Sequence, residues 1–137
     1  ENKAVVRAMY SAVDASQSMS PVAEYAAPGY VVHFPGAPPL DANGIAQLGN
    51  SFYEACPGMR HELESVIAEG DTVALMMRVI GTHTQPLMTP AGPIPPQRKS
   101  FDVGAMNFFR FENGKIAEHF SAFDMMGFMQ QIGAIPA

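Results

Sequence analysis

Residues 99–123 read KSFDVGAMNFFRFENGKIAEHFSAF, and this stretch decides the fold. Apolar and polar residues alternate on both sides of Glu112-Asn113-Gly114-Lys115, whose Asn-Gly centre is typical of a two-residue hairpin turn. The pattern predicts two long antiparallel strands, 99–112 and 116–123, joined by that turn. On the first strand, period 2 places six residues on one face: Phe101, Val103, Ala105, Asn107, Phe109 and Phe111.

The same period extends back towards residue 61. Residues 61–69 and 72–83 predict two further strands, and Glu69-Gly70-Asp71 is a hairpin signal between them. Residues 30–34, which are aromatic and β-branched, predict an earlier strand. The segment 86–96 is predicted to be an irregular connection, because it contains Pro86, Pro90, Pro93, Pro95 and Pro96.

Apolar residues recur at helical spacing before and after these strands. The predicted helices cover 2–15, 18–25, a segment that begins after Asp41 or Asn43 and stops at Pro57-Gly58, and 125–132. Helices on one face of an antiparallel sheet give an α+β fold. We expect residues 1–137 to form one domain, with a strongly curved, mostly antiparallel sheet of about five or six strands wrapped over three or four helices. Such a cone encloses an internal apolar pocket.

Composition excludes several classes of protein. The 137 residues carry 13 acidic and 8 basic side chains, a net charge of −5, which argues against binding to nucleic acid or to an anionic membrane. A single cysteine excludes an internal disulfide framework. No apolar run approaches the ~20 residues that span a bilayer, so we expect a cytoplasmic protein. The 10 methionines and 9 phenylalanines indicate either ordinary core filling or an apolar cavity.

Several stretches together resemble one known family. They are Asn2–Arg7, Pro28–His33, Ala68–Ala74, Gly81–Thr84 and Phe109–Phe120. In this order they look like the SnoaL-like polyketide cyclases of the nuclear transport factor 2-like superfamily, which also holds ketosteroid isomerases and non-catalytic binding modules. The resemblance implies a deep apolar cavity, a homodimer through the convex sheet face, no metal or organic cofactor, and acid–base catalysis by a pocket aspartate.

Asp124 is the first candidate for that aspartate. It follows the last strand among Phe120, Phe123, Met125 and Met126, where we expect desolvation to raise the pKa of its carboxyl group towards that of a useful base. By resemblance it matches the aspartate that the cyclases use. The alternative is that Asp124 simply caps the final helix.

Three further polar residues are candidates for the same site. Asn107 is a lone amide on an apolar strand face, at a position that resembles the oxyanion-hole aspartate of the ketosteroid isomerases; the alternative is an amide bonded across the sheet. His119 is either a proton relay or a satisfied structural histidine. His33 precedes Phe34, which stands where the isomerases have their carboxylate base, so we do not expect isomerase chemistry by that base.

Motifs for other chemistries are missing from the sequence. The four histidines have no metal-binding spacing, and neither a Gly-x-Ser-x-Gly nor a Gly-x-Gly-x-x-Gly motif occurs. We therefore expect an enzyme without metal or cofactor that acts on a small apolar carbonyl or cyclic compound, with Asp124 as base and His119, His33 and Asn107 as polar partners. The alternatives are a binding module with no turnover, or a dimeric interaction protein. The residues expected to line the pocket are Phe34, Phe52, Met77, Phe109, Phe120 and Phe123.

Overall fold

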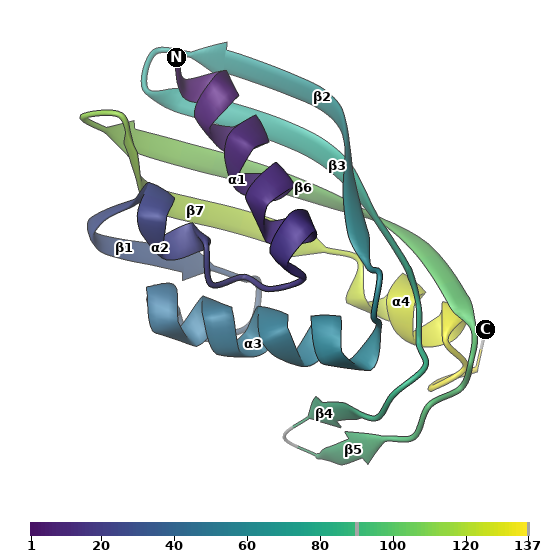
Figure 1. Ribbon diagram of the computed structural model, residues 1–137. Coiled ribbons are helices and arrows are strands. Elements are labelled where there is room, and N and C mark those ends of the chain that lie inside the picture. Colours follow the sequence, from purple (N-terminus) through teal and green to yellow (C-terminus); the bar gives the residue numbers. More distant parts are fainter. Residues whose placement is uncertain (90, 137) are drawn as a thin grey trace.

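The computed structural model describes residues 1–89 and 91–136 as an α+β fold. Helices cover one side of a curved sheet, and the opposite side of the sheet faces outward (Figure 1). This layer arrangement confirms the fold class predicted from the sequence. The helices are α1 (Asn2–Ser16), α2 (Val22–Tyr25), α3 (Ala42–Ala55) and α4 (Met125–Gln131).

A five-stranded sheet with the strand order β1-β7-β6-β3-β2 frames the molecule. Its strands are β1 (Ala26–His33), β2 (Arg60–Glu69), β3 (Thr72–Thr82), β6 (Ser100–Glu112) and β7 (Lys115–Phe123). Three neighbouring pairs are antiparallel, whereas β1 runs parallel to β7. Most of the chain separates β1 from β7, so no hairpin constrains their relative direction.

The first strand begins earlier than the sequence predicts. β1 already starts at Ala26, although it contains Pro28 and Gly29, and its register against β7 shifts between Ala26 and Val31. Proline is tolerated at this position because β1 is an edge strand with a local irregularity. As a consequence α2 is one short turn, and the predicted helix over 18–25 is too long.

The proline-rich segment 86–96, which we expected to be irregular, contains two short strands. β4 (Leu87–Thr89) and β5 (Gly92–Ile94) form a small antiparallel pair beside the main sheet, while Pro90 lies outside the described residues. Met88 is the register partner of Pro93. A two-stranded ribbon consists only of edges, so the missing N–H of a proline breaks no central ladder.

The core lies between the inner sheet face and the helices. β6 alternates buried and exposed residues along most of its length, and the six residues predicted to share one face are all buried. α1 contributes Val6, Met9, Tyr10 and Val13 to the core. Phe128 of α4 is fully buried and its ring packs against three others, those of Phe52, Phe101 and Phe123.

Two hollows open on the outer surface formed by the described residues. One of about 400 Å³ lies beside Gly104, Met106 and Asp124, and one of about 440 Å³ lies between β1 and the start of α3 at Asp41. Neither is enclosed, and neither is lined by Asn107 or His119. The internal apolar pocket therefore remains a prediction. Within residues 1–89 and 91–136, no helix is long and apolar enough to cross a membrane.

Candidate functional site

A polar pair lies in the middle of the inner sheet face. Asn107 of β6 is 2% exposed, and His119 of the neighbouring strand β7 is 5% exposed. His119 Nε2 lies 2.8 Å from Asn107 Oδ1. Because an amide oxygen only accepts, His119 donates from Nε2, and in a neutral ring Nδ1 then carries no proton. The fold thus brings two of the residues predicted from the sequence into direct contact.

Burial keeps the His119 ring uncharged. The pKa of His119 falls to about 3, because a charged ring would lose its hydration in the interior. Phe109 stacks on this ring with the two centroids 4.2 Å apart. The hydroxyl group of Tyr30 on β1 lies 3.4 Å from His119 Nδ1 and donates to it. His119 is therefore a neutral ring that holds the Asn107 side chain in place.

The amide nitrogen of Asn107 has no partner. Nδ2 is buried, and no hydrogen-bond acceptor for it occurs among the described residues. An unpaired buried donor costs about 1–3 kcal/mol, and a ligand oxygen that accepts its hydrogen would recover that cost. The structure thus leaves a buried N–H group of Asn107 without an acceptor among the described residues.

A second polar cluster joins α1, α3 and β2. Tyr53 donates its hydroxyl hydrogen to Asp14 Oδ1 at 2.7 Å, and His61 donates from Nδ1 to the same oxygen at 2.8 Å. Burial of Asp14 opposes its ionisation, but the hydrogen bonds from His61 and Tyr53 outweigh burial and lower the pKa of the carboxyl group. No pattern in the sequence predicts this cluster, because its members lie far apart in the chain and form no motif.

Asp124 does not lie in the desolvated environment that we expected. It is exposed, as are its sequence neighbours Phe120, Met125 and Met126. Its Oδ1 accepts the backbone N–H of Gly127 at 2.9 Å, so Asp124 is the N-cap of α4. The capping alternative is the one that the structure supports.

Substitution of Asp124 separates its capping role from other roles. Asp124→Ala should lower the free energy of unfolding by about 1 kcal/mol, whereas Asp124→Asn should leave it nearly unchanged, because asparagine caps helices as well as aspartate does. Urea unfolding followed by circular dichroism measures both values. An equal loss in the two variants would contradict the capping role.

His33 and Phe120 also lie outside the interior, contrary to expectation. His33 Nε2 donates to Glu118 Oε2 at 2.7 Å, and its ring stacks on Phe120 with centroids 4.7 Å apart. Phe120 is 45% exposed on the outer sheet face. The hydrogen bond from His33, with help from Arg110, lowers the pKa of Glu118. These residues belong to the surface of the sheet and do not line an inner pocket.

The other residues expected around the pocket lie in or against the core. Met77 and Phe109 are buried, while Phe34, Phe52 and Phe123 are partly buried and pack against the core. In the part of the chain that the structure describes, no three His, Cys, Asp or Glu residues are grouped closely enough to hold a metal ion.

Comparison with known protein families identifies the family of this chain. The sequence profile of the SnoaL-like polyketide cyclases matches residues 4–132. The chain belongs to this family. The resemblance found in the sequence is thereby confirmed, and with it the cyclase type of fold that surrounds Asn107 and His119.

Solved structures of the same fold cover almost the whole chain. AclR from Streptomyces galilaeus, named a candidate hydroxylase, is 24% identical with a TM-score of 0.85, over 98% of this chain and 97% of that one. IdmH from Streptomyces antibioticus, named a candidate polyketide cyclase, is 22% identical with a TM-score of 0.80, over 97% of this chain and 99% of that one. No curated protein matches the sequence significantly. At these identities the solved structures establish the fold alone.

Proposed function

We propose that this protein is a cyclase- or isomerase-type enzyme that needs no cofactor and acts by proton transfer on a small apolar carbonyl compound. The observation that carries the proposal is the buried Asn107 Nδ2, which lacks a partner while Oδ1 of the same side chain is held by His119. Membership of the SnoaL-like family supports the reaction class. The candidate cyclase and candidate hydroxylase among the solved relatives leave the substrate open.

Asn107 would act on the oxygen of the substrate. When a base removes a proton from the carbon next to a carbonyl group, the C–H electron pair forms a C=C bond and the carbonyl π pair moves onto oxygen. The Asn107 N–H then donates to that enolate oxygen. In an aldol closure the enolate carbon attacks a second carbonyl carbon, a C–C bond forms, and the new alkoxide takes the proton back from the base.

The surroundings of Asn107 favour an uncharged substrate. His119 is neutral, Tyr30 is a neutral hydroxyl because burial raises the pKa of its phenol group, and Phe109 presents an apolar ring. Met77 pairs in register with Ala105, two residues from Asn107 along β6. A methionine side chain changes conformation easily, so it can make room for a ring of carbon atoms.

Hydrogen exchange on a model ketone tests the proposal. The purified protein is mixed with 2-tetralone in D₂O, and deuterium uptake at the carbons next to the carbonyl is followed by mass spectrometry. We expect exchange well above the buffer rate, in wild type and Asp124→Asn alike. Binding of 2-tetralone without exchange would favour the binding-module alternative. If 2-tetralone neither bound nor exchanged, the proposal would be overturned.

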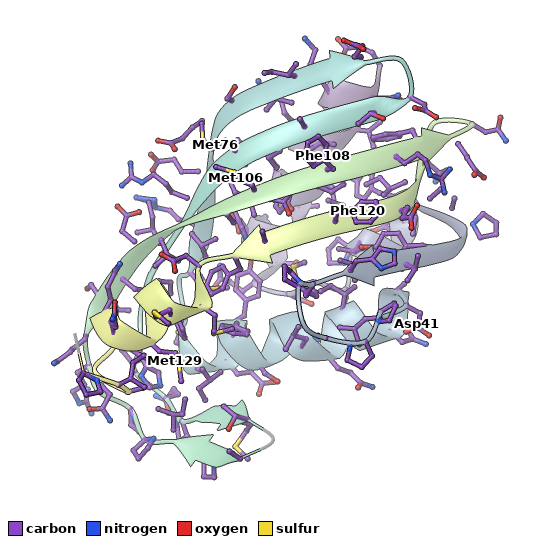
Figure 2. The ribbon with its side chains drawn as sticks, turned by 180° about the vertical axis from the view of Figure 1, so that it is seen from behind. Asp41, Met76, Met106, Phe108, Phe120 and Met129 are labelled. Carbon is purple, nitrogen blue, oxygen red and sulfur yellow. The ribbon has the colours of Figure 1, made fainter. Side chains whose placement is uncertain are left out.

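We also propose that two copies associate through the outer sheet face. Figure 2 shows Met76, Met106, Phe108 and Phe120 on this face, and each is 44–62% exposed. The charged residues around them are paired within the chain, Arg78 with Asp102 and Arg110 with Glu118. An apolar centre with a neutralised polar rim fits an identical face related by a two-fold axis.

A charge in the centre of that face should separate the two copies. We expect Phe108→Glu to shift the protein from dimer to monomer in sedimentation velocity, because two carboxylates would be buried opposite each other. Met88→Glu is the matched control, since Met88 is 63% exposed on β4, away from the sheet. A wild-type protein that sediments as a monomer would contradict this interface.

A further inference from the structure

Asp14 holds His61 in one orientation. His61 gives the carboxylate two hydrogen bonds, from its ring Nδ1 to Oδ1 and from its backbone N–H to Oδ2, each at 2.8 Å. Tyr53 adds a third at 2.7 Å. Both carboxylate oxygens are therefore occupied, and neither the ring nor the carboxylate is free to turn.

This arrangement decides which nitrogen of His61 is basic. Nδ1 carries the hydrogen that Asp14 accepts, so Nε2 keeps its lone pair. No hydrogen bond to Nε2 occurs among the described residues. The side chain is 8% exposed, and that of Asp14 is 23% exposed. A carboxylate and an oriented imidazole whose Nε2 accepts no hydrogen bond are the parts of a general base.

Tyr10 connects this cluster with the Asn107 site. Its ring lies 5.0 Å from the His61 ring and 6.3 Å, edge-on, from the ring of Phe109, which itself stacks on His119. Burial, with the nearby Tyr30 and Asp14, raises the pKa of Tyr10 far above its usual range. Its hydroxyl group stays protonated and forms no hydrogen bond within residues 1–89 and 91–136. Ring contacts through Tyr10 therefore link the two clusters.

We propose that His61 is the proton-transferring residue of this protein and that Asp14 is its positioning residue. The proposal rests on the function proposed above and supplies the base that the reaction needs. His61 Nε2 takes the proton from the carbon next to the carbonyl, and the C–H electron pair passes into the enolate. The ring becomes an imidazolium stabilised by Asp14, and it returns the proton to the alkoxide formed in the aldol step.

The groups that face His61 favour this cycle. Asp14 stabilises the charged ring, while Tyr53 and Tyr10 remain neutral because burial raises the pKa of each phenol group. Our earlier candidate for the base, Asp124, is exposed and caps α4. His119 is a poor base, because burial lowers its pKa to about 3.

Exchange of 2-tetralone in D₂O tests the assignment. We expect His61→Gln to lower the exchange rate about 10²–10⁴-fold, with the Kd for 2-tetralone changed less than twofold. Asp41→Asn is the matched control: it replaces a carboxylate that caps α3 outside this cluster, and exchange should stay within threefold of wild type. Normal exchange in folded His61→Gln would overturn the assignment and leave the proposed function standing. No exchange in wild type would overturn both.

Asp14→Asn provides an independent readout if His61→Gln does not fold. An amide holds the His61 ring less firmly than the carboxylate does and cannot balance the charge of the imidazolium, so the exchange rate per folded molecule should fall about 10²-fold while the Kd for 2-tetralone changes less than twofold. A purely structural role would reduce the amount of folded protein without lowering the rate per folded molecule. A wild-type rate in folded Asp14→Asn would therefore contradict the positioning role of Asp14.

Discussion

Asn107→Leu is expected to lower the exchange rate on 2-tetralone about 10²–10³-fold, the effect of removing one donor from an oxyanion site. Leucine branches at Cγ as asparagine does but has no N–H group, so the enolate oxygen would have no donor in place of Nδ2. The ketone oxygen in the ground state carries less charge than the enolate oxygen. We therefore expect the rate to fall more than the affinity. Mass spectrometry of the exchanging ketone measures the rate.

Ser121→Ala is the matched control for Asn107→Leu. Ser121 is the register partner of Asn107 on β7 and is also largely buried, but Asn107 Nδ2 remains in this variant. Exchange should stay within threefold of wild type. If folded Asn107→Leu exchanged the ketone at the wild-type rate, the role of the amide would be contradicted.

Acid should lower the free energy of unfolding of the wild type more than that of the His119→Gln variant. In the native state the pKa of His119 is about 3, whereas an unfolded histidine has a pKa near 6.5. Between these values the unfolded chain binds the proton and the native chain does not, so stability falls as pH falls below about 6.5. Over the interval from pH 7 to pH 4.5 this histidine alone accounts for a loss of about 2 to 3 kcal/mol.

Urea unfolding of both proteins at pH 7 and pH 4.5 measures this difference. Glutamine retains an amide that can donate to Asn107 but does not titrate in this range. Burial also lowers the pKa of His83, but His83 is present in both proteins and its effect cancels. If both proteins lost the same stability between the two pH values, His119 would not be buried in its neutral form.

Local patterns were sufficient to predict most of the fold. The alternation along β6 correctly placed Asn107 among buried apolar residues, and the Asn113-Gly114 turn set the pairing of β6 with β7. Of the two residues predicted to begin the third helix, Asp41 and Asn43, it is Asp41 that caps α3, with its Oδ1 accepting the N–H of Gly44 at 2.8 Å. Each of these features depends on residues close together in the chain.

The errors about side-chain orientation had a physical cause. Successive side chains on a strand point to opposite faces, so an inward His119 requires an outward Phe120, and an inward Val32 requires an outward His33. For Asp124, apolar sequence neighbours were mistaken for apolar surroundings. Only Phe128 of α4 is fully buried, and Met125 and Met126 lie exposed.

The Asp14–His61–Tyr53 cluster could not be predicted from local patterns. His61 is 47 residues from Asp14, and Tyr53 is 39 residues from it. Their meeting depends on how α1 and α3 pack against the first residues of β2, which no spacing in the sequence encodes. A cluster assembled by packing in this way is visible only once the fold is known.

The side-chain amide resonances of Asn107 test the central claim most directly. In a ¹H–¹⁵N spectrum of labelled protein, we expect 2-tetralone to shift the Nδ2 protons downfield as its oxygen accepts a hydrogen bond. Tetralin, which has the same rings and no oxygen, should leave them in place. The account would be contradicted if saturating 2-tetralone left these resonances unmoved, or if tetralin shifted them equally.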